Sequence, residues 1–204
     1  MTILVTGFGP FGGETVNPSW QAVEQLSQPE SGGEIVRVRL PVTYAGCAGP
    51  VLDAIRETEP GAIVMTGQAG GRTELSIERL AVNLDDAQAA DNDGVVRQGV
   101  PVIPHGPAAY FATLPVTAIA AHLRKAGCPA VVSNTAGLYV CNHLMYRVLH
   151  YIAASGRDIR AGFVHVPFLP EQIADRPGTP SMSLACMTAG LQHIVEFLVS
   201  LAGR

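Results

Sequence analysis

The segment SNTAGLYVCN, Ser133 to Asn142, joins a short apolar run at Ala130–Ser133 to a long helical pattern that stops at Gly156. It predicts a buried strand, a tight Thr-Ala-Gly turn and a helix, a succession typical of α/β folds. Cys141 lies about one turn into that helix. Peptide N–H groups at a helix start are unpaired and the helix dipole is positive there, so we expect the thiolate to be favoured and the pKa of the thiol to be lowered.

The same cysteine also has a purely structural interpretation, because it begins a regular apolar stripe along the expected helix. The stripe consists of Cys141, Leu144, Met145, Val148, Leu149 and Ile152. Free cysteine packs as a small hydrophobe, so this pattern alone fits a buried, inert thiol as well.

Apolar strands and amphipathic helices alternate along the rest of the chain. Buried strands are expected at residues 3–6, 34–40, 62–66, 130–133 and 160–166, and helices at 18–27, 44–57, 115–126, from the cysteine to 155, and 181–201. We therefore expect residues 1–204 to form a single α/β domain, a three-layer α/β/α sandwich with a mixed, largely parallel central sheet.

Two segments depart from this regular alternation. The pattern from Leu75 to Val82 alternates between apolar and polar residues, which predicts a strand exposed on one face, and this strand carries Glu78. Residues 83–107 are rich in Asp, Asn, Gly and Pro and predict a long irregular segment with a hairpin around Asn92-Asp93-Gly94. Long loops in compact domains are often functional.

Composition excludes several classes of protein. The 204 residues are 48% hydrophobic and 15% charged with a net charge of −4, so neither nucleic acid nor an anionic membrane surface is expected as a partner. Lys125 is the only lysine, which excludes a P-loop and a Schiff-base enzyme. The amino terminus lacks a signal-peptide pattern and no apolar stretch approaches ~18 residues, so a cytoplasmic location is expected.

The four cysteines are scattered and form no C-x-x-C pair: Cys47, Cys128, Cys141 and Cys186. This spacing indicates reduced thiols rather than a disulfide framework or a zinc site. No metal and no cofactor is therefore expected.

A glycine pattern, Gly7-x-Gly9-x-x-Gly12, formally matches the dinucleotide-binding fingerprint, so a nucleotide-dependent oxidoreductase is an alternative. In that fingerprint the glycines open directly into a helix. Here the helix is expected to begin later, with Asn17 as its cap and Pro18 at its first position. Phe8 and Phe11, in the same segment, are either core residues or the wall of an apolar pocket.

Reactive residues gather at the ends of the expected strands, where open α/β sheets place their sites. Cys141 supplies a nucleophile, His165 a base and Glu78 an acid to orient the base, which is the arrangement of a cysteine hydrolase. Gln68 follows a neighbouring strand. His105, in the long loop, is a reserve candidate for the base. Structural alternatives remain, namely a core histidine at 165 and an exposed strand carboxylate at 78 paired with Arg79 or another arginine.

At these residues the chain resembles the pyroglutamyl peptidase I family of cysteine peptidases. The likeness spans nearly the full length and is carried by TGFGPFGG with NPSW, GQAGG with LSIERLAVN, GPAAYFATLP, SNTAGLYVCN and HVP. The resemblance implies that Cys141 is the nucleophile, His165 the general base and acid, and Glu78 the residue that orients the imidazole. It also implies a pyroglutamyl pocket formed or bordered by Phe8, Phe11, Gln68, Tyr139 and Val140.

The resemblance implies hydrolysis of the amide bond after an amino-terminal pyroglutamyl residue, through a thioester on Cys141. An apolar, aromatic slot with a few amide groups suits this uncharged lactam ring. The family also implies peptide substrates and a homo-oligomer, frequently a tetramer. A pocket protein that kept the fold without the chemistry is the third alternative, and the presence of all three proposed catalytic residues argues against it.

Overall fold

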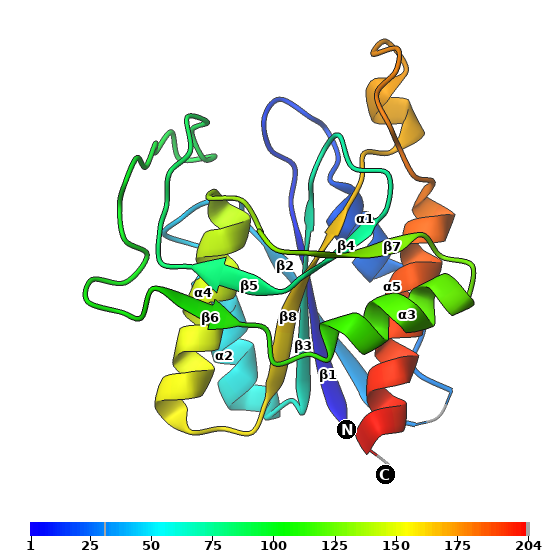
Figure 1. Cartoon of the computed structure of the whole chain (residues 1–204), viewed down its shortest axis with the longest axis horizontal. Helices are drawn as coiled ribbons and strands as arrows, with labels where there is room; N and C mark the ends of the chain where they lie inside the picture. Colours follow the sequence, from blue (N-terminus) through cyan, green and yellow to red (C-terminus); the bar gives the residue numbers. More distant parts are fainter. Residues whose placement is uncertain (31, 203–204) are drawn as a thin grey trace.

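A twisted six-stranded sheet forms the centre of the protein in the computed structural model, which describes residues 1–30 and 32–202 (Figure 1). Its strands lie in the order β2 (Glu34–Leu40), β1 (Thr2–Phe8), β3 (Ala62–Gln68), β8 (Arg160–Val166), β4 (Leu75–Glu78) and β7 (Ala130–Ser133). Neighbouring strands are parallel except β4 and β8, which pair antiparallel. The expected mixed, largely parallel sheet is confirmed.

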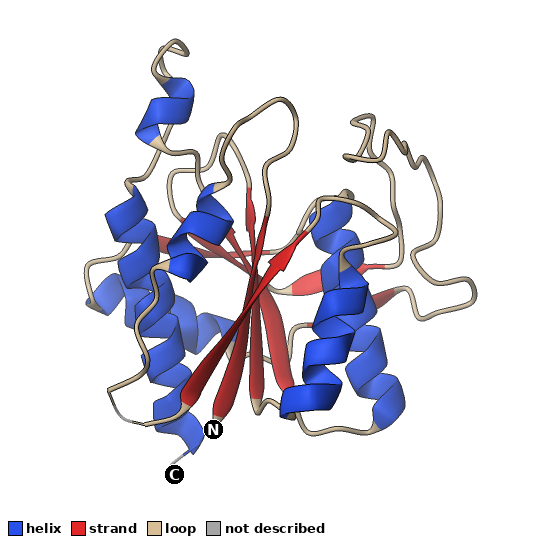
Figure 2. Ribbon diagram, turned by 180° about the vertical axis from the view of Figure 1, so that it is seen from behind, coloured by secondary structure: helices blue, strands red, loops and turns tan. Residues whose placement is uncertain are grey.

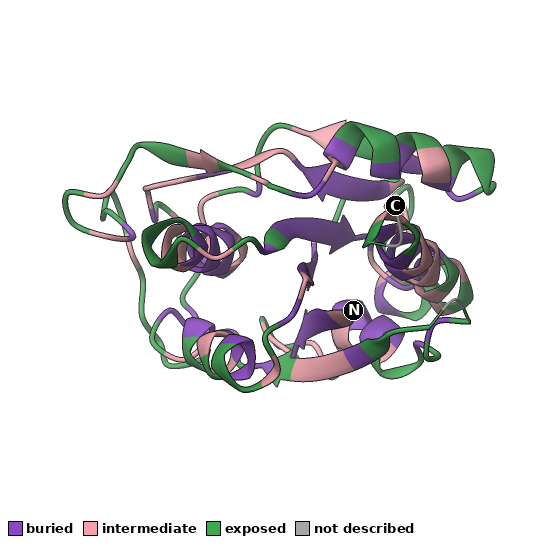
Figure 3. Ribbon diagram, turned by 90° about the horizontal axis from the view of Figure 1, so that it is seen from below, coloured by how far each residue is buried: buried purple, intermediate pink, exposed green. Residues whose placement is uncertain are grey.

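Helices cover both faces of this sheet, as Figure 2 shows from behind. On one face α1 (Pro18–Glu24), α3 (Val116–Lys125) and α5 (Leu184–Ala202) enclose one hydrophobic core. On the other face α2 (Ala48–Thr58) and α4 (Val140–Ser155) enclose a second core. In the view from below, the inner strands are buried between the two helical layers, whereas the edge strands β2 and β7 are partly exposed (Figure 3). The expected α/β/α sandwich is therefore confirmed.

Local sequence signals explain where the helices begin and end. The side chain of Asn17 accepts a hydrogen bond from the amide of Ser19, and Pro18 occupies the first helical position of α1, where its missing N–H costs nothing. Gly156 ends α4 in the left-handed conformation that glycine adopts without strain. Helix α2 begins at Ala48 rather than at Tyr44, which places Pro50 in its first turn, where proline is tolerated.

The expected one-sided strand at residues 75–82 is wrong. Arg79 separates two strands, since β4 ends at Glu78 and β5 (Leu80–Val82) pairs with β6 (Ala109–Phe111) in a separate two-stranded sheet. Every residue of β4 is buried, because this strand lies between β7 and β8 and α5 packs over it, with Gly190 against Leu75. The short sequence pattern could not reveal this double coverage.

The long segment at residues 83–107 contains none of the named helices or strands in the described part of the chain, as expected. A reverse turn forms at Asp91–Gly94, where the amide of Gly94 donates to the carbonyl of Asp91, and an isolated antiparallel bridge joins Asp85 to Val100. The predicted hairpin is therefore present in irregular form.

Helix α5 is long and apolar enough to cross a membrane by length and composition alone. Its apolar face, however, packs into the first core with Met187, Leu191, Ile194 and Leu198, all 1% exposed or less. This burial against the sheet is typical of a core helix.

Candidate active site

Glu78 and His165 form a buried pair where β4 meets β8. Their strands are antiparallel, and Glu78 lies opposite Phe163, so His165 is its diagonal neighbour two residues further along β8. The Oε1 atom of Glu78 accepts a hydrogen bond from Nδ1 of His165 at 2.7 Å. Glu78 is fully buried and His165 is 3% exposed. The geometry excludes the alternative of an exposed strand carboxylate, and Arg79 instead donates to Asn134.

Arg72 compensates for the buried charge of Glu78, and the sequence interpretation missed this role. Its Nη1 atom donates to the same Glu78 oxygen at 2.8 Å, and its side chain is 26% exposed. A buried carboxylate without a cation would be strongly destabilised. The only signal in the sequence was the position of Arg72 at the end of the GQAGGR loop, three residues before the start of β4.

His165 presents its second ring nitrogen to the site. Nδ1 is occupied by Glu78, and Nε2 makes no hydrogen bond within residues 1–30 and 32–202. Burial lowers the pKa of His165 below its ordinary value, although the hydrogen bond and charge of Glu78 oppose that shift. The imidazole is therefore held neutral, with Nε2 available to accept a proton.

Cys141 is the second residue of α4, and its sulfur lies over β3 beside His165. An ideal Cβ on Gly67 would come within 2.9 Å of Sγ, and Gly67 is the register partner of His165. Glycine is therefore required at position 67 for the sulfur to approach the sheet. Tyr139, the N-cap residue of α4, makes no capping hydrogen bond through its side chain, so within the described residues the first amide groups of the helix are open to a ligand.

The expected lowering of the thiol pKa is wrong. The pKa of Cys141 is raised to about 12, chiefly by burial and then by the nearby Cys47 thiol and the Glu78 carboxylate. Arg72 and the amide of Cys141 itself lower it, but less strongly. The helix start favours a thiolate, as the sequence suggested, but desolvation by side chains distant in the sequence outweighs it.

A narrow, mainly apolar pocket adjoins the sulfur. Its walls are Phe8, Phe11, Asn17, Val42, Gln68, Tyr139, Val140 and Cys141. The structure thus gathers all five residues expected around a ligand pocket and adds two that the sequence interpretation missed. Asn17 was identified only as a helix cap, and Val42 follows β2 without any distinguishing motif.

Tyr139 connects the pocket to the long loop. Its ring lies between those of Phe11 and Tyr44, with centroids at 6.4 and 5.7 Å, and its hydroxyl donates to the carbonyl of Ala90 at 2.8 Å. The loop at residues 83–107 therefore contacts the wall of the pocket directly.

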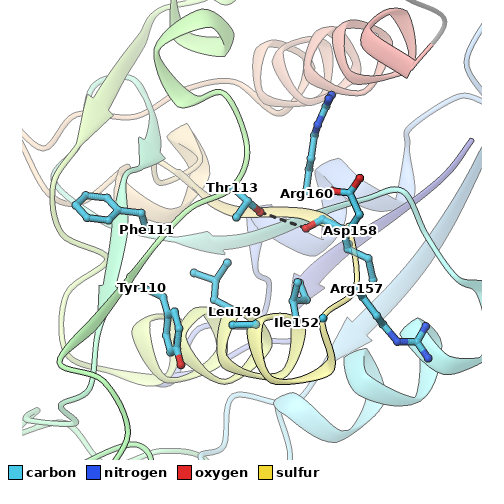
Figure 4. Close-up of a pocket in the computed structure, with 11 residues that line it drawn as sticks. Tyr110, Phe111, Thr113, Leu149, Ile152, Arg157, Asp158 and Arg160 are labelled. Carbon is cyan, nitrogen blue, oxygen red and sulfur yellow. Dashed lines mark hydrogen bonds between the residues drawn. The ribbon is translucent and has the colours of Figure 1, made fainter.

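The larger cavity in Figure 4, about 540 Å³, is remote from this chemistry. It is lined by residues at the end of α4 and the start of β8, among them Leu149, Ile152 and Arg160, whereas Cys141 lies at the start of α4. Along the helix, Leu149 and Ile152 lie roughly 12 and 17 Å from Cys141 at 1.5 Å per residue. Size alone does not identify the site.

His143 and the reserve candidate His105 lie apart from the sulfur. His143, two residues after Cys141, hydrogen-bonds Asp85 through Nδ1 at 2.7 Å in the second core region. His105 is exposed on the long loop in a left-handed backbone conformation. Neither has a contact with Glu78 or Cys141 among the interactions of the described residues.

The glycine segment after β1 does not form a dinucleotide site. A Cβ on Gly7 would lie 2.7 Å from the backbone of Trp20, so this glycine allows α1 to pack on β1. Gly12 precedes α1 by several residues, and the side-chain Nδ2 of Asn17 donates to the carbonyl of Gly9. The free helix start that a pyrophosphate needs does not follow the glycines.

A buried acid–imidazole pair beside a cysteine at a helix start defines the class of the cysteine hydrolases. A family model described as pyroglutamyl peptidase matches residues 1–200. The chain therefore belongs to the pyroglutamyl peptidase family, and the nucleotide-dependent alternative is not favoured.

Individual relatives agree with this assignment. Pyrrolidone-carboxylate peptidase 1 of Caldanaerobacter subterraneus subsp. tengcongensis is 45% identical over 199 residues, covering 98% of both chains. Pyrrolidone-carboxylate peptidase of Thermococcus kodakarensis is 48% identical over 198 residues, covering 97% of this chain and 96% of the relative. The crystal structure of pyroglutamyl peptidase I from Bacillus amyloliquefaciens superposes with a TM-score of 0.90 at 42% identity, covering 94% of this chain and 91% of that one.

Proposed function

We propose that this protein removes an amino-terminal pyroglutamyl residue from peptides, with Cys141 as nucleophile, His165 as general base and acid, and Glu78 as the residue that orients the imidazole. Membership of the family supports the activity. The observation that carries the residue assignment is the chain of contacts from Arg72 through Glu78 to His165, beside the sulfur of Cys141.

The resting site holds a neutral thiol and a neutral imidazole, because burial raises the pKa of Cys141 and lowers that of His165. As Sγ forms a bond to the scissile carbonyl carbon, its proton passes to Nε2 of His165. Glu78 stabilises the imidazolium that results. Collapse of the tetrahedral intermediate breaks the C–N bond, and His165 returns the proton to the leaving amine.

Water completes the cycle. The pyroglutamyl thioester on Cys141 is attacked by a water molecule whose proton is taken by His165, and the sulfur leaves with a proton. The products are free pyroglutamate and the restored thiol. The amide of Cys141, at the uncapped start of α4, is the proposed donor to the oxyanion of both tetrahedral intermediates.

The pocket beside the sulfur suits the proposed substrate group. Phe8 and Val140 are 2% exposed or less and present apolar surface, while Gln68 supplies a polar amide. No acidic side chain is among the residues lining it. An aminopeptidase needs such an anion to hold a charged terminal amine, whereas a lactam carries no charge.

The direct test is release of a fluorogenic amine from a pyroglutamyl amide, measured beside the matching prolyl amide. We expect turnover of the pyroglutamyl compound only, and a loss of at least about 10³-fold in Cys141→Ser. Undiminished turnover in Cys141→Ser would exclude the assigned nucleophile. Equal cleavage of the prolyl amide would exclude specificity for the lactam.

We also propose that residues 1–204 act as one peptidase domain, in the cytoplasm and as a homo-oligomer, possibly of four chains. The free state of all four cysteines supports a reducing compartment. Phe111 is 68% exposed, and a large apolar side chain exposed in this way supports a contact with another chain at the surface near β6. Cell fractionation tests the location.

A further inference from the structure

Gln68 of the pocket is held by a second buried glutamine, Gln172, from the short 3₁₀ helix at Pro170–Ile173 that follows β8. Nε2 of Gln172 donates to Oε1 of Gln68 at 3.0 Å. Gln68 is 9% exposed and Gln172 is 8% exposed, so this hydrogen bond is largely shielded from water. The mechanism described above does not use Gln172.

The direction of this hydrogen bond is dictated by the backbone. The amide of Leu169 donates to Oε1 of Gln172 at 3.0 Å, and a peptide N–H can only donate. The oxygen of Gln172 must therefore face Leu169 and its NH₂ group must face Gln68. Consequently Gln68 must turn its oxygen toward Gln172.

The amide nitrogen of Gln68 is then the end left for a ligand. Nε2 of Gln68 makes no hydrogen bond with the described residues, and it is not among the buried side-chain atoms that lack a partner. Gln68 also lines the pocket beside Cys141. Gln68 thus brings to the wall of the pocket an amide group whose orientation is set from outside the pocket.

We infer that Gln172 is a positioning residue that fixes the amide of Gln68 with its NH₂ group toward a hydrogen-bond acceptor of the substrate, the ring oxygen of the lactam. The inference rests on the proposed function. A lactam has this carbonyl and a proline ring does not. A site built to donate to a ligand oxygen discriminates strongly against an analogue that lacks it.

Gln172→Glu tests the inference because it removes only the hydrogen-bond donor that Gln172 offers to Gln68. A carboxylate at position 172 still accepts from the amide of Leu169, so the 3₁₀ helix keeps this bond, but it cannot donate to Gln68. Gln68 must turn over to donate to the carboxylate, which brings its oxygen to the pocket. We expect KM for the pyroglutamyl amide to rise about tenfold or more, with kcat changed by less than about threefold.

Three further variants separate this role from simple support of the fold. Gln172→Met frees Gln68 to adopt either orientation, so its KM should rise less than that of Gln172→Glu. In a Gln68→Ala background, Gln172→Glu should have no further effect on KM. Gln28→Glu is the matched control, because Gln28 also accepts from a backbone amide, that of Ile35, outside the residues of the pocket.

An unchanged KM in Gln172→Glu, or the same rise in KM in the Gln68→Ala background, would overturn the inference. If Gln172→Glu does not fold, a KM in Gln172→Met equal to that of the wild type would overturn it. An inactive wild-type protein would overturn the proposed function and this inference together. An active wild type with an unaffected Gln172→Glu variant would overturn only the inference.

Discussion

A single oxygen atom, Oε1 of Glu78, receives hydrogen bonds from both His165 and Arg72 in the interior of the protein. The arginine balances the charge of the carboxylate, and the histidine acquires a fixed ring orientation with Nε2 toward the site. A charge-assisted bond of this kind also stabilises the imidazolium that forms as the thiol loses its proton. Arg72 therefore supports the site without contacting the sulfur.

Glu78→Gln should preserve the shape of the side chain and remove its charge. We expect kcat/KM to fall by about 10²–10⁴-fold, because the imidazolium loses its carboxylate and the ring loses its fixed orientation. Steady-state kinetics with the pyroglutamyl amide measures this effect. The exposed Glu57→Gln is the control and should match the wild type. Wild-type kinetics in Glu78→Gln would argue against the assigned role.

The pH dependence of kcat/KM should report the lowered pKa of His165. The base must be neutral to accept the thiol proton, so activity should fall as the pH drops through the pKa of His165. Since burial lowers this pKa, the midpoint of the acid limb should lie below about 6.5, the value of an unperturbed histidine. A midpoint above that value would contradict the assignment.

The same shift has a consequence for stability. The unfolded chain binds a proton at residue 165 more readily than the folded chain, so folding is favoured above the ordinary histidine pKa. This contribution to the free energy of unfolding is lost as the pH falls through the unfolded value and below it. Urea denaturation at several pH values should therefore give a smaller decrease on acidification for His165→Gln than for the wild type.

At this scale the sequence predicted the residues better than their environment. Cys141, His165 and Glu78 could be proposed because their residue types, and their positions at or after the expected strands, are visible in the chain. The raised thiol pKa and the partnership of Arg72 with Glu78 could not, because both depend on burial by residues far apart in the sequence. Asn17 and Val42 had no pattern that indicated a pocket.

Among the elements, the long loop at residues 83–107 is attached to the pocket from several directions. The amide of Asn92 donates to the carbonyl of Val42, its side chain donates to the carbonyl of Pro10, and Ala90 accepts from Tyr139. Three separate segments that line or flank the pocket are thus joined through one loop. The loop acts as a structural part of the site.

Asp85 anchors the base of this loop to α4. Its Oδ2 atom accepts from His143 at 2.7 Å and from Arg97 at 2.9 Å, and the guanidinium of Arg97 lies 4.7 Å from the ring centre of Tyr44. Asp85 is fully buried. The loop and the helix that carries the nucleophile therefore share one ionic anchor.

Asp85→Ala should lower the free energy of unfolding by about 3 kcal/mol, because it leaves two donors without their buried partner. We expect KM to rise as well, since the pocket loses a support. Denaturant unfolding and steady-state kinetics measure the two effects. Asp53→Ala, which removes an exposed ion pair with Arg56, is the control and should cost less than about 1 kcal/mol. Equal losses in the two variants would refute the anchoring role.

The elements themselves were largely predictable. The expected ranges of β2, β7 and β8 agree with the structure, because strand-forming runs rich in Val, Ile and Phe and bounded by Gly or Pro mark strands. The separation of β4 from β5 was missed, since an eight-residue alternation does not reveal that its first half enters a different sheet. Strand β6 was also missed because it is only three residues long.

At the scale of the whole molecule, α4 packs against one face of the sheet as part of a helical layer. This packing places the start of α4 at the end of β8. The order of the strands could not be read from the sequence, because β4 follows β3 in the chain but pairs antiparallel with β8. This antiparallel pairing brings Glu78 beside His165. The catalytic arrangement is thus a property of the complete fold.

The surface around β6 provides a test of the proposed assembly. Phe111 is strongly exposed and borders the cavity of Figure 4, which lies away from the site. We expect light scattering to give the mass of more than one chain, and Phe111→Ser to reduce it while the activity per chain is retained. A wild-type mass of one chain would exclude the homo-oligomer.

The role of Cys141 as nucleophile is tested by mass spectrometry of the protein after a rapid acid quench during turnover of a pyroglutamyl amide. We expect one pyroglutamyl group to be attached to the peptide containing Cys141, and Cys141→Ser to show neither this adduct nor turnover. A pyroglutamyl group on any other residue, or undiminished turnover in Cys141→Ser, would contradict it.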